Sequence, residues 1–556
     1  MEPIWLKHYP AAVPRDINVS LYPSLVDLLD TSFKKNAAKP AYLMMGKSMS
    51  FGQVDEASRA LAAYLQSLGL EKGDRVALMM PNLFQYPVAV AAVLRAGYVV
   101  VNVNPLYTPR ELEHQLKDSG AKAIVIIENF ASVLQQVIKN VPTKHVILAA
   151  MGDMLGLKGL LVNYVVRKVK KMVPAFELPG AVKFNDALAK GRGLTYKAPK
   201  LGPDDIAVLQ YTGGTTGVSK GAVLLHRNLV ANILQSEAWY QPALKKIPAG
   251  EQVTTICALP LYHIFGFNTN MMLSMHMGGA NVLIPNPRDL GAVFKELANH
   301  RFHSFPAVNT LFMAMANHPD FGTVDWSRLV ISVGGGMAVQ QATAKLWLEK
   351  TGCPIVEGYG LSETSPSASC NPTDSTAYSG TIGLPMPLTE LELLDDDGNE
   401  VPMGQPGEIA IRGPQVMAGY WQRPDETAKV MTADGYFRTG DIGTVDERGY
   451  FKIVDRKKDM ILVSGFNVYP NEVEDVITQM PGVLECAAVG VPDSKAGEAV
   501  KVVIVKKDPN VTEADVRAYC EANLTGYKRP KIVEFRTELP KTPVGKILRR
   551  ELRDKS

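Results

Sequence analysis

The stretch Tyr211–Gly221 has the residue types needed to hold a phosphate chain. It contains four glycines, three threonines, one serine and one lysine. Glycine permits a positive φ and a close approach of the backbone to a ligand, and successive backbone N–H groups in such a turn form a concavity that binds anions. Because hydroxyl donors and a cation lie in the same loop, the stretch predicts a polyphosphate site.

This loop differs from the Walker A motif of P-loop nucleotidases. That motif places Gly-Lys-Ser/Thr directly before a helix, whereas here Lys220 stands between Ser219 and Gly221. Residues 222–225 indicate a short strand, and a helix is expected only from about His226. The pattern therefore predicts strand, loop and strand, and it disfavours an ordinary P-loop enzyme. The alternative is a glycine-rich surface turn without a ligand.

Elements that would position this loop alternate along the first 365 residues. Residues 22–70 indicate helices around a short hairpin, and strands and helices alternate from Gly73 to Ile126, which favours a largely parallel sheet. After the loop, strands at 329–333 and 354–356 lead into Gly334–Gly336 and Glu357–Thr364. Ligands of open α/β sheets bind beyond the carboxyl ends of strands. Both segments are therefore expected to converge on the central loop.

The pattern changes from residue 380 to short strands and turns, which predicts a small β unit over about 380–454. The charged turn 454–459 marks a boundary, with a solvated turn as its simplest interpretation. Beyond it, helices at 472–479 and 513–523 and strands at 485–491 and 500–506 predict an α+β module large enough to be a domain. The expected fold class is thus α/β: a large N-terminal domain of doubly wound sheets with the small β unit, and a small α+β domain.

Composition excludes several classes of protein. The chain has 556 residues and a net charge of +3, so there is no general case for nucleic-acid binding. Its five cysteines are scattered without Cys-x-x-Cys spacing, which indicates reduced thiols in a cytoplasmic protein rather than a zinc site. The first eight residues lack the layout of a signal peptide. The apolar segment 259–285 contains histidines and asparagines, and it is expected to line a pocket rather than cross a membrane.

Residues 154–174 combine an apolar stretch with a basic end. Lys158, Arg167, Lys168, Lys170 and Lys171 occur here without an intervening acidic residue. Such a segment can lie in a membrane interface, or it can be a solvated helix with one face packed on the protein. Both interpretations stay open, with peripheral contact on the inner face of the cytoplasmic membrane as a hypothesis.

Together these motifs resemble the ATP-dependent adenylate-forming enzymes, which include acyl-CoA synthetases, firefly luciferase and peptide-synthetase adenylation domains. The resemblance covers nearly the whole chain and rests on motifs in a fixed order, namely Tyr211–Gly221, Leu259–Phe267, Gly334–Gly336, Glu357–Thr364, Tyr436–Asp441, Asp455-Arg456 with Gly465, and Pro540–Lys546. Within that superfamily the chain is most similar to bacterial long-chain fatty acid–CoA ligases, an impression strengthened by residues 104–109 and by the basic insert 154–174.

The resemblance implies a two-step reaction. A fatty acid carboxylate attacks the α-phosphorus of ATP to give acyl-AMP and pyrophosphate, and the thiolate of CoA then displaces AMP. An anion attacks an anion in the first step, so cations and positioned donors must supply much of the catalysis. The implied co-substrates are ATP and CoA, and the implied cofactor is Mg²⁺.

Roles follow for matching residues. Lys546, His263 and Glu363 are the implied catalytic residues: Lys546 at the α-phosphate, His263 near the acyl carboxylate, and Glu363 with Thr212 at the magnesium ion. Asp441 is expected to bind both ribose hydroxyls, and Tyr359 to stack on adenine. The full set of implied nucleotide and CoA contacts is Tyr211, Thr212, Gly213, Gly214, Thr215, Thr216, Gly217, Lys220, Gly335, Gly336, Glu357, Gly358, Tyr359, Gly360, Asp441, Ile453, Arg456 and Gly465. Each of these residues taken singly is more often a turn former, a surface charge or a core residue.

The resemblance also implies a moving C-terminal domain. It divides the chain into residues 1–454 and 455–556 with a hinge at Asp455, because Lys546 must occupy the site in the first step and CoA needs an open path in the second. Gly465 would lie beside that path. Phe267 stands where long-chain relatives carry a gating aromatic residue, often tryptophan. Methionines at 271, 272, 275 and 277 are expected to line an adaptable apolar tunnel, or else to be plain core.

Rival functions remain open at this point. Within enzymes, the rivals are a fatty acyl-AMP ligase and an aryl- or medium-chain acyl-CoA ligase. In a different class, the rival is a membrane-associated fatty-acid-binding or transport component with a vestigial nucleotide site. The oligomeric state, including a homodimer, is open.

Overall fold

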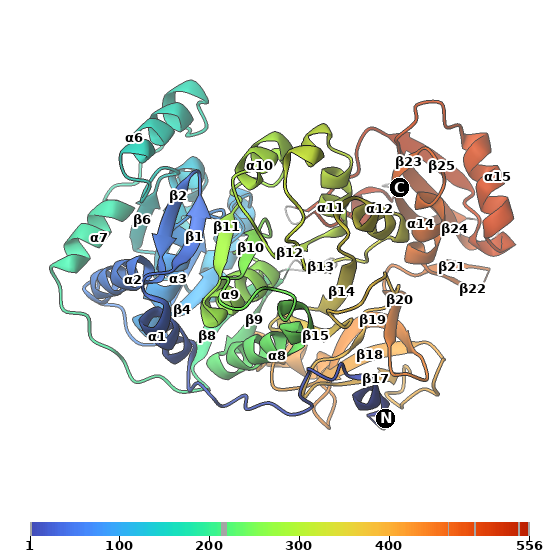
Figure 1. The fold of residues 1–556 in the computed structure, drawn as a ribbon, viewed down its shortest axis with the longest axis horizontal. Helices are drawn as coiled ribbons and strands as arrows, with labels where there is room; N and C mark the ends of the chain where they lie inside the picture. Colours follow the sequence, from blue (N-terminus) through green and yellow to red (C-terminus); the bar gives the residue numbers. More distant parts are fainter. Residues whose placement is uncertain (1–2, 213–218, 465, 494–495, 543–544, 554–556) are drawn as a thin grey trace.

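Four β-sheets and the helices around them make up the protein in the computed structural model, which describes residues 3–212, 219–464, 466–493, 496–542 and 545–553. The chain runs from two large sheets through a small antiparallel sheet to a terminal module (Figure 1). The predicted α/β fold class is confirmed by this arrangement.

A seven-stranded sheet carries the glycine-rich loop. Its strand order is β7-β6-β5-β3-β4-β8-β9, and all neighbours are parallel except β8 and β9. The strands are β3 (Arg75–Met79), β4 (Val99–Asn102), β5 (Ala123–Ile127), β6 (His145–Ala149), β7 (Val182–Lys183), β8 (Ile206–Thr212) and β9 (Lys220–Leu225). The predicted strand, loop and strand is therefore confirmed at β8–β9, and α8 begins at His226 as expected.

A nine-stranded sheet carries the two other predicted segments. Its order is β16-β15-β14-β13-β12-β10-β11-β1-β2, parallel from β14 to β1 and antiparallel at both ends. The strands are β1 (Pro40–Met44), β2 (Lys47–Ser50), β10 (Thr254–Cys257), β11 (Ala280–Leu283), β12 (Ser304–Ala307), β13 (Ile331–Gly334), β14 (Ile355–Gly360), β15 (Ser367–Cys370) and β16 (Leu384–Pro385). Glu357–Gly360 thus continues β14, whereas the sequence placed these residues after a strand.

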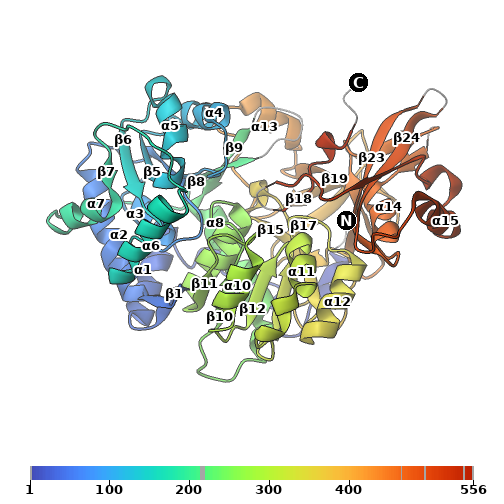
Figure 2. The same ribbon diagram turned by 90° about the horizontal axis from the view of Figure 1, so that it is seen from above.

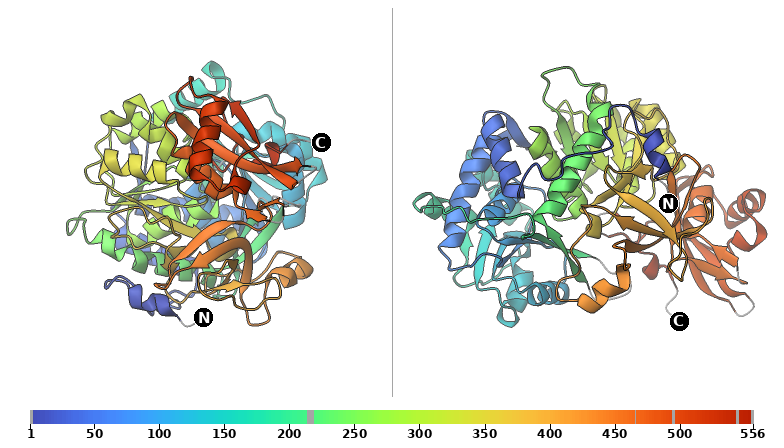
Figure 3. Two further views of the ribbon diagram at one scale, coloured as in Figure 1. Left: turned by 90° about the vertical axis from the view of Figure 1, so that its right-hand side faces the viewer. Right: turned by 90° about the horizontal axis from the view of Figure 1, so that it is seen from below.

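A four-stranded antiparallel sheet follows, formed by β17 (Glu390–Leu394), β18 (Gly407–Arg412), β19 (Phe437–Val445) and β20 (Phe451–Arg456). The start of the chain packs on this sheet and on β16 of the nine-stranded sheet. The Trp5 ring meets the Phe451 ring edge-on with centroids 6.4 Å apart, and the Tyr9 hydroxyl donates to the Pro385 carbonyl at 2.5 Å, across 376 positions of sequence. Figure 3 shows this N-terminal segment beside the small sheet.

The terminal module has its own sheet and core. Strands β21 (Ile461–Val463), β22 (Phe466–Val468), β23 (Val483–Asp493), β24 (Gly497–Lys506) and β25 (Ile532–Arg536) form the sheet, with β25 parallel to β24. Helices α14 (Pro470–Thr478) and α15 (Glu513–Asn523) accompany it. The predicted helix 513–523 has the bounds expected, and α14 begins two residues before the predicted 472.

Helix α3 (Gln85–Arg95) is buried on every side. All residues of α3 are buried, as expected for a helix that is apolar around its whole circumference. The helices before α14 are α1 (Leu25–Asn36), α2 (Phe51–Gln66), α3 (Gln85–Arg95), α4 (Pro109–Ser119), α5 (Ala131–Val137), α6 (Leu157–Tyr164), α7 (Phe184–Arg192), α8 (His226–Leu244), α9 (Leu273–Met277), α10 (Leu290–Leu297), α11 (Asn309–Ala316), α12 (Gln341–Thr351) and α13 (Pro424–Val430).

The predicted insert 154–174 forms α6 and a π-helical turn, Val165–Val169. It lies at the end of the molecule away from the terminal module (Figure 1 and Figure 2). Within the part of the chain that the structure describes, no helix has the length and apolar character needed to span a bilayer. The segment 259–285 forms largely buried π-helix, helix and strand, so its burial is confirmed, whereas its role in lining a pocket stays a prediction.

The charged turn expected at 454–459 is confirmed only at 457–459, and its first residues correct the prediction. Strand β20 continues to Arg456, and the Asp455 side chain is fully buried instead of solvated. Its Oδ1 accepts from the backbone N–H of Arg456 at 2.7 Å, and its Oδ2 accepts from that of Asn471 at 2.8 Å. A buried carboxylate needs such donors, and alternation in sequence alone did not reveal that the strand extends this far.

Candidate active site

Strands β8 and β9 close the base of the glycine-rich loop. Thr212 and Lys220 are cross-strand partners, and the Ser219 hydroxyl donates to the Thr212 carbonyl at 2.6 Å. Tyr211, one residue earlier, donates its hydroxyl to Asp118 Oδ2 at 2.7 Å. The predicted contacts Gly213, Gly214, Thr215, Thr216 and Gly217 lie outside the described residues. The structure thus fixes both ends of the predicted phosphate loop.

Lys220 is held by helix α13. Its Nζ lies 2.6 Å from Glu426 Oε2 and 4.6 Å from the centre of the Tyr420 ring. Hydrogen bonds from Lys220 and Lys429 lower the pKa of Glu426 to about 2. Lys220 was expected to bind a phosphate; in the structure its ammonium group is paired with the carboxylate of Glu426, with which a nucleotide would have to compete.

Glu363 lies at the end of the same chain of contacts. The Tyr420 hydroxyl donates to Glu363 Oε1 at 2.8 Å, and the Glu363 carbonyl accepts from the Met417 N–H at 2.8 Å. Burial raises the pKa of Glu363. No group of three or more acidic, histidine or cysteine residues suited to a metal occurs among the described residues. A single carboxylate fits Mg²⁺, which is commonly held by one or two carboxylates together with substrate phosphates.

Asp441, Tyr359 and Arg456 form a second cluster. Asp441 and Arg456 are cross-strand partners in β19 and β20, and Arg456 Nε lies 3.1 Å from Asp441 Oδ1. The Tyr359 hydroxyl donates to the other oxygen, Oδ2, at 2.7 Å. Asp441 is therefore an acceptor anchored between the nine-stranded and four-stranded sheets. Ile453, also on β20, is partly buried against the core.

Glycines bring the β13 and β14 segments close together. A Cβ on Gly335 would come within 3.3 Å of the Gly358 carbonyl, and a Cβ on Gly360 would collide with the Pro366 carbonyl. Gly336 has φ +76°, which favours glycine. Glu357 Oε1 accepts from the Val339 N–H at 3.0 Å, and burial raises the pKa of Glu357 to about 8. The carboxyl of Glu357 therefore supports the backbone here.

Lys546 reaches this site from the terminal module. Burial, then the nearby charge of Arg456, lowers the pKa of Lys546 to about 7, whereas Asp441 opposes that shift. Burial, then Lys546, lowers the pKa of His263 to about 4. The neighbouring Gly545 carbonyl accepts from Thr310 at 3.3 Å. The structure thus brings together Lys546, His263, Asp441 and Arg456, as predicted, while Gly465 lies outside the described residues.

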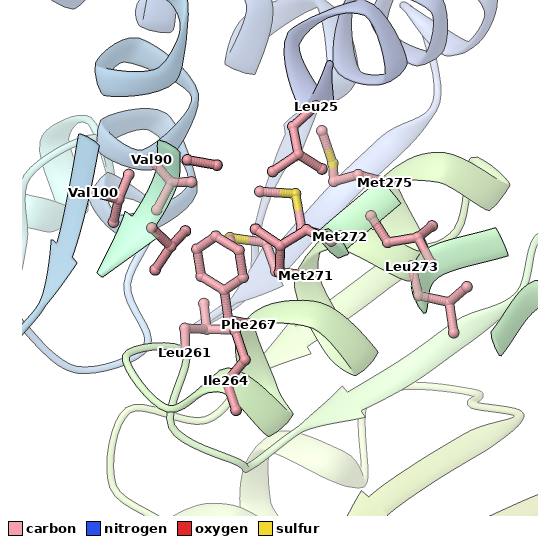
Figure 4. Packing of buried hydrophobic residues seen from close by; sticks show 14 of the residues in the cluster. Leu25, Val90, Val100, Leu261, Ile264, Phe267, Met271, Met272, Leu273 and Met275 are labelled. Atoms are coloured by element: carbon pink, nitrogen blue, oxygen red, sulfur yellow. The ribbon is translucent and has the colours of Figure 1, made fainter. Parts of the chain in front are cut away.

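The predicted acyl region is closely packed (Figure 4). Phe267, Met271, Met272 and Met275 are buried, and Met277 is partly buried against the same core. A void of about 10 Å³ remains among Met271, Met272, Met275 and the side chains of Leu29, Phe33 and Tyr42. The Tyr42 hydroxyl has no hydrogen-bond partner among the described residues. Admission of an acyl chain would require these side chains to move.

Comparisons with known proteins show the family and the fold. The model of the family described as AMP-binding enzyme matches residues 29–421, and that of the AMP-binding enzyme C-terminal domain matches residues 472–546. The chain belongs to the AMP-binding enzyme family. Its adenylate-forming fold is shared by the anthranilate CoA ligase AuaEII in complex with anthranoyl-AMP (TM-score 0.85, 27% identity, 96% of this chain and 98% of that one). ATP-bound MatB from Rhodopseudomonas palustris gives a TM-score of 0.76 at 29% identity, covering 95% and 98%.

Sequence relatives of this AMP-binding enzyme include two long-chain-fatty-acid–CoA ligases. The protein of that name from Escherichia coli O6:H1 is 57% identical over 100% of this chain and 99% of its own length. The one from Bacillus subtilis is 36% identical over 99% and 97%. A feruloyl-CoA synthase from an Amycolatopsis species is 34% identical over 91% and 94%.

Several residues of this AMP-binding enzyme's site were missed by sequence reasoning. Tyr420 and Glu426 hold Glu363 and Lys220, and the exposed Lys458 lies close enough to Lys546 for its charge to lower the pKa of Lys546. Arg456 contacts Asp441, and the charge of Asp441 also reaches Lys458 and Lys546. Lys458 could have been noticed two positions after Arg456, but no local pattern distinguishes Tyr420 or Glu426.

Proposed function

We propose that this AMP-binding enzyme activates long-chain fatty acids to acyl-CoA through an acyl-AMP intermediate. It consumes ATP and CoA and releases AMP and pyrophosphate. One observation carries the chemistry: Arg456 lies 3.1 Å from Asp441, and Lys546 and Lys458 are near enough for the charge of Asp441 to oppose the lowering of their pKa values, so cations outnumber the carboxylate where a phosphate would bind. The long-chain preference is supported by the names of the relatives at 57% and 36% identity.

In the first step the protein's task is electrostatic. A fatty acid oxygen forms a bond to the α-phosphorus while the bond to the β-phosphate oxygen breaks, and pyrophosphate leaves with that electron pair. Lys546 and Arg456 would neutralise the charge that accumulates on the α-phosphate. Asp441 would hold the ribose, and Tyr359 would present its ring to adenine. His263, which is partly buried, would help to orient the carboxylate by hydrogen bonding.

Glu363 and Thr212 would hold Mg²⁺, which would offset phosphate charge and orient the leaving group. Tyr420 would keep the Glu363 carboxylate directed into the site. Lys220 would exchange Glu426 for the β- and γ-phosphates as ATP binds. The loop residues Gly213–Gly217 complete the proposed phosphate contacts.

The second step is proposed to use a different placement of residues 455–556 relative to residues 1–454, with Asp455 as the hinge. The CoA thiolate would then attack the acyl carbonyl along a path beside Gly465 and expel AMP. The proximity of Lys546 to Arg456 and His263 in the arrangement described above supports its assignment to the first step. Phe267 would act as the gate of the acyl pocket, and the neighbouring methionines would form its adaptable wall.

Peripheral membrane contact through residues 154–174 is part of the proposal. Leu157, Leu160, Leu161 and Tyr164 of α6 are exposed by 88%, 70%, 64% and 60%. Such a cluster of exposed apolar side chains is rare on a monomer surface, and the basic residues 168, 170 and 171 follow it directly. Exposed apolar side chains followed by basic residues favour binding of this segment to an anionic lipid surface.

The decisive experiment is ATP–pyrophosphate exchange by the purified protein across a series of fatty acid chain lengths, followed by thioester formation with CoA. We expect exchange only with a fatty acid, strongest for long chains, and a CoA-dependent thioester. Exchange without thioester would favour an acyl-AMP ligase, and a maximum with aryl or medium-chain acids would favour those ligases. Fatty acid binding without exchange, or release of orthophosphate instead of AMP, would overturn the proposal.

A further inference from the structure

The guanidinium group of Arg549 ties together parts of the terminal module that are distant in sequence. Its Nε and Nη2 lie 3.0 and 2.8 Å from the two carboxylate oxygens of Glu474, and Nη2 also donates to Asn471 Oδ1 at 2.6 Å. Such a two-point Arg–carboxylate pair fixes orientation as well as distance. Glu474 in turn accepts from the Ala488 N–H at 2.8 Å. Arg549 therefore anchors its segment to both α14 and β23.

The same side chain faces the proposed hinge. Arg549 Nη1 lies 3.8 Å from Asp455 Oδ1 and 3.6 Å from Asp459 Oδ2. Asp455 is fully buried and also accepts from the Asn471 backbone, so Arg549 and the start of α14 contact one hinge carboxylate together. Rotation of the backbone at residue 455 would redirect this carboxylate relative to the guanidinium group.

Only two residues separate Arg549 from Lys546, and hydrogen bonds to residues 540–542 hold this segment in place. Lys541 and Ile547 form an antiparallel bridge, the Lys546 N–H donates to Thr542 Oγ1 at 3.0 Å, and the Leu548 N–H donates to the Pro540 carbonyl at 2.8 Å. A displacement at Arg549 would therefore be passed on to Lys546, three residues away. This linkage uses none of the groups that would touch the nucleotide.

We propose that Arg549 is a positioning residue that holds Lys546 in the active site by fastening its segment to Glu474 and to the hinge carboxylate Asp455. The inference rests on the proposed function, because it assumes that Lys546 serves the first step only. Arg549 would act through Lys546 and would not itself contact the substrate. Arg549 therefore couples the setting of the hinge to the placement of the catalytic ammonium group.

The test compares both half-reactions in the full-length Arg549→Met variant. Since misplacement of a catalytic group by about 1 Å can cost about 100-fold, we expect exchange to fall roughly 100-fold. Thioester formation from supplied acyl-AMP should stay within about twofold of the unmodified protein. The matched control is Arg550→Met, which changes the neighbouring exposed arginine and should alter neither half-reaction.

A double-mutant cycle with Lys546→Ala separates positioning from general damage. If Arg549 acts through Lys546, the Arg549→Met/Lys546→Ala protein should lose no more exchange activity than Lys546→Ala alone. Independent losses that multiply, or an equal loss of both half-reactions in Arg549→Met, would overturn the proposal.

Folding and function are checked separately. If Arg549→Met does not fold, the cycle is run with Arg549→Lys, which keeps the charge but loses the two-point geometry, and the same outcomes apply. Because every comparison is made against unmodified protein, absence of exchange in that protein would instead be a failure of the proposed function.

Discussion

The surroundings of Lys546 disfavour its positive charge, because the side chain is partly buried and other cations lie near it. It is partly buried beside Arg456 and Lys458, with Asp441 as the nearby carboxylate, and its pKa is lowered to about 7. Such a placement costs stability in the absence of an anion. It suits a group that is meant to meet a phosphate, because the ligand supplies the missing negative charge.

We expect this cost to show in the pH dependence of stability. The pKa of Lys546 is about 7 in the folded protein and has its higher, ordinary value in the unfolded chain. Between these two pH values the unfolded chain binds more protons at Lys546 than the folded protein does, so the free energy of unfolding rises with pH in that window. This contribution of Lys546 to stability is lost as the pH falls through about 7. Lys546→Met, which is uncharged, should therefore raise the thermal midpoint of the terminal module near pH 6 and have less effect near pH 9. Calorimetry would measure both.

Lys345→Met is the control for that experiment, since Lys345 is an exposed lysine on α12. It should change the midpoint little at either pH. If Lys546→Met instead shifted the midpoint equally at both pH values, packing rather than charge would account for the effect.

At this scale the sequence predicted which residues belong to the site but not how they are held. Lys546, His263, Asp441 and Arg456 were all expected in one place. Tyr420 is 57 positions from Glu363, and Glu426 is 206 positions from Lys220. Such contacts depend on how separate sheets pack, and no local periodicity in the sequence encodes them.

Among the helices, α6 has an unusual surface. Four of its eight residues are large apolar side chains exposed by 60% or more. Arg167, just beyond it, pairs with Glu128, so the turn after α6 is attached to the protein through a basic residue. The apolar face of α6 is thus held outward.

Leu157→Glu/Leu160→Glu should abolish binding to vesicles of anionic phospholipid, because two carboxylates would replace the side chains that enter the lipid interface. Flotation of the variant and of the unmodified protein would measure this, and ATP–pyrophosphate exchange should be unchanged in both. Leu21→Glu/Ile532→Glu, at exposed apolar positions elsewhere, is the matched control and should still bind.

Two results would contradict membrane contact by α6. One is binding that is equal in all three proteins. The other is a fall in mass by light scattering in the α6 variant alone, which would assign the surface to a homodimer.

At the scale of elements, strands with strong apolar runs were predicted well, and their ends less so. Asp455 was expected in a solvated turn because five of the six residues at 454–459 are charged. It is buried because its carboxylate finds two backbone N–H groups and an arginine, a compensation supplied by α14 and by the end of the chain.

Across the whole molecule, the terminal module touches the rest of the protein through scattered polar contacts. Thr310 donates to Gly545, Lys507 to Asn317 at 3.1 Å, and the Gln341 N–H to Asp475 at 3.4 Å. A polar interface of this kind favours relative motion of domains. This is consistent with the proposed rotation between the two half-reactions.

A cross-link at one of these contacts should separate the half-reactions. In Gln341→Cys/Asp475→Cys, a short, reducible bis-thiol reagent should hold the module in place, so that exchange continues while thioester formation stops. The five native cysteines are buried and should not compete. Reduction of the cross-link should restore thioester formation, and Gln341→Cys alone, treated identically, is the control. Unimpaired thioester formation in the cross-linked protein would argue against rotation.

The attachment of Trp5 and Tyr9 to residues 451 and 385 has a consequence for biosynthesis. At about 5–20 residues per second, a ribosome needs roughly 20–75 s to make the 376 positions that separate Tyr9 from Pro385. Throughout that interval the Tyr9 hydroxyl lacks its acceptor, although the Tyr9 ring can already pack on Trp239, and the Trp5 ring has to wait longer still for Phe451. We therefore expect nascent chains to bind a chaperone through this segment. We also expect the small sheet that bears Asp441 to complete its packing among the last parts of the large domain.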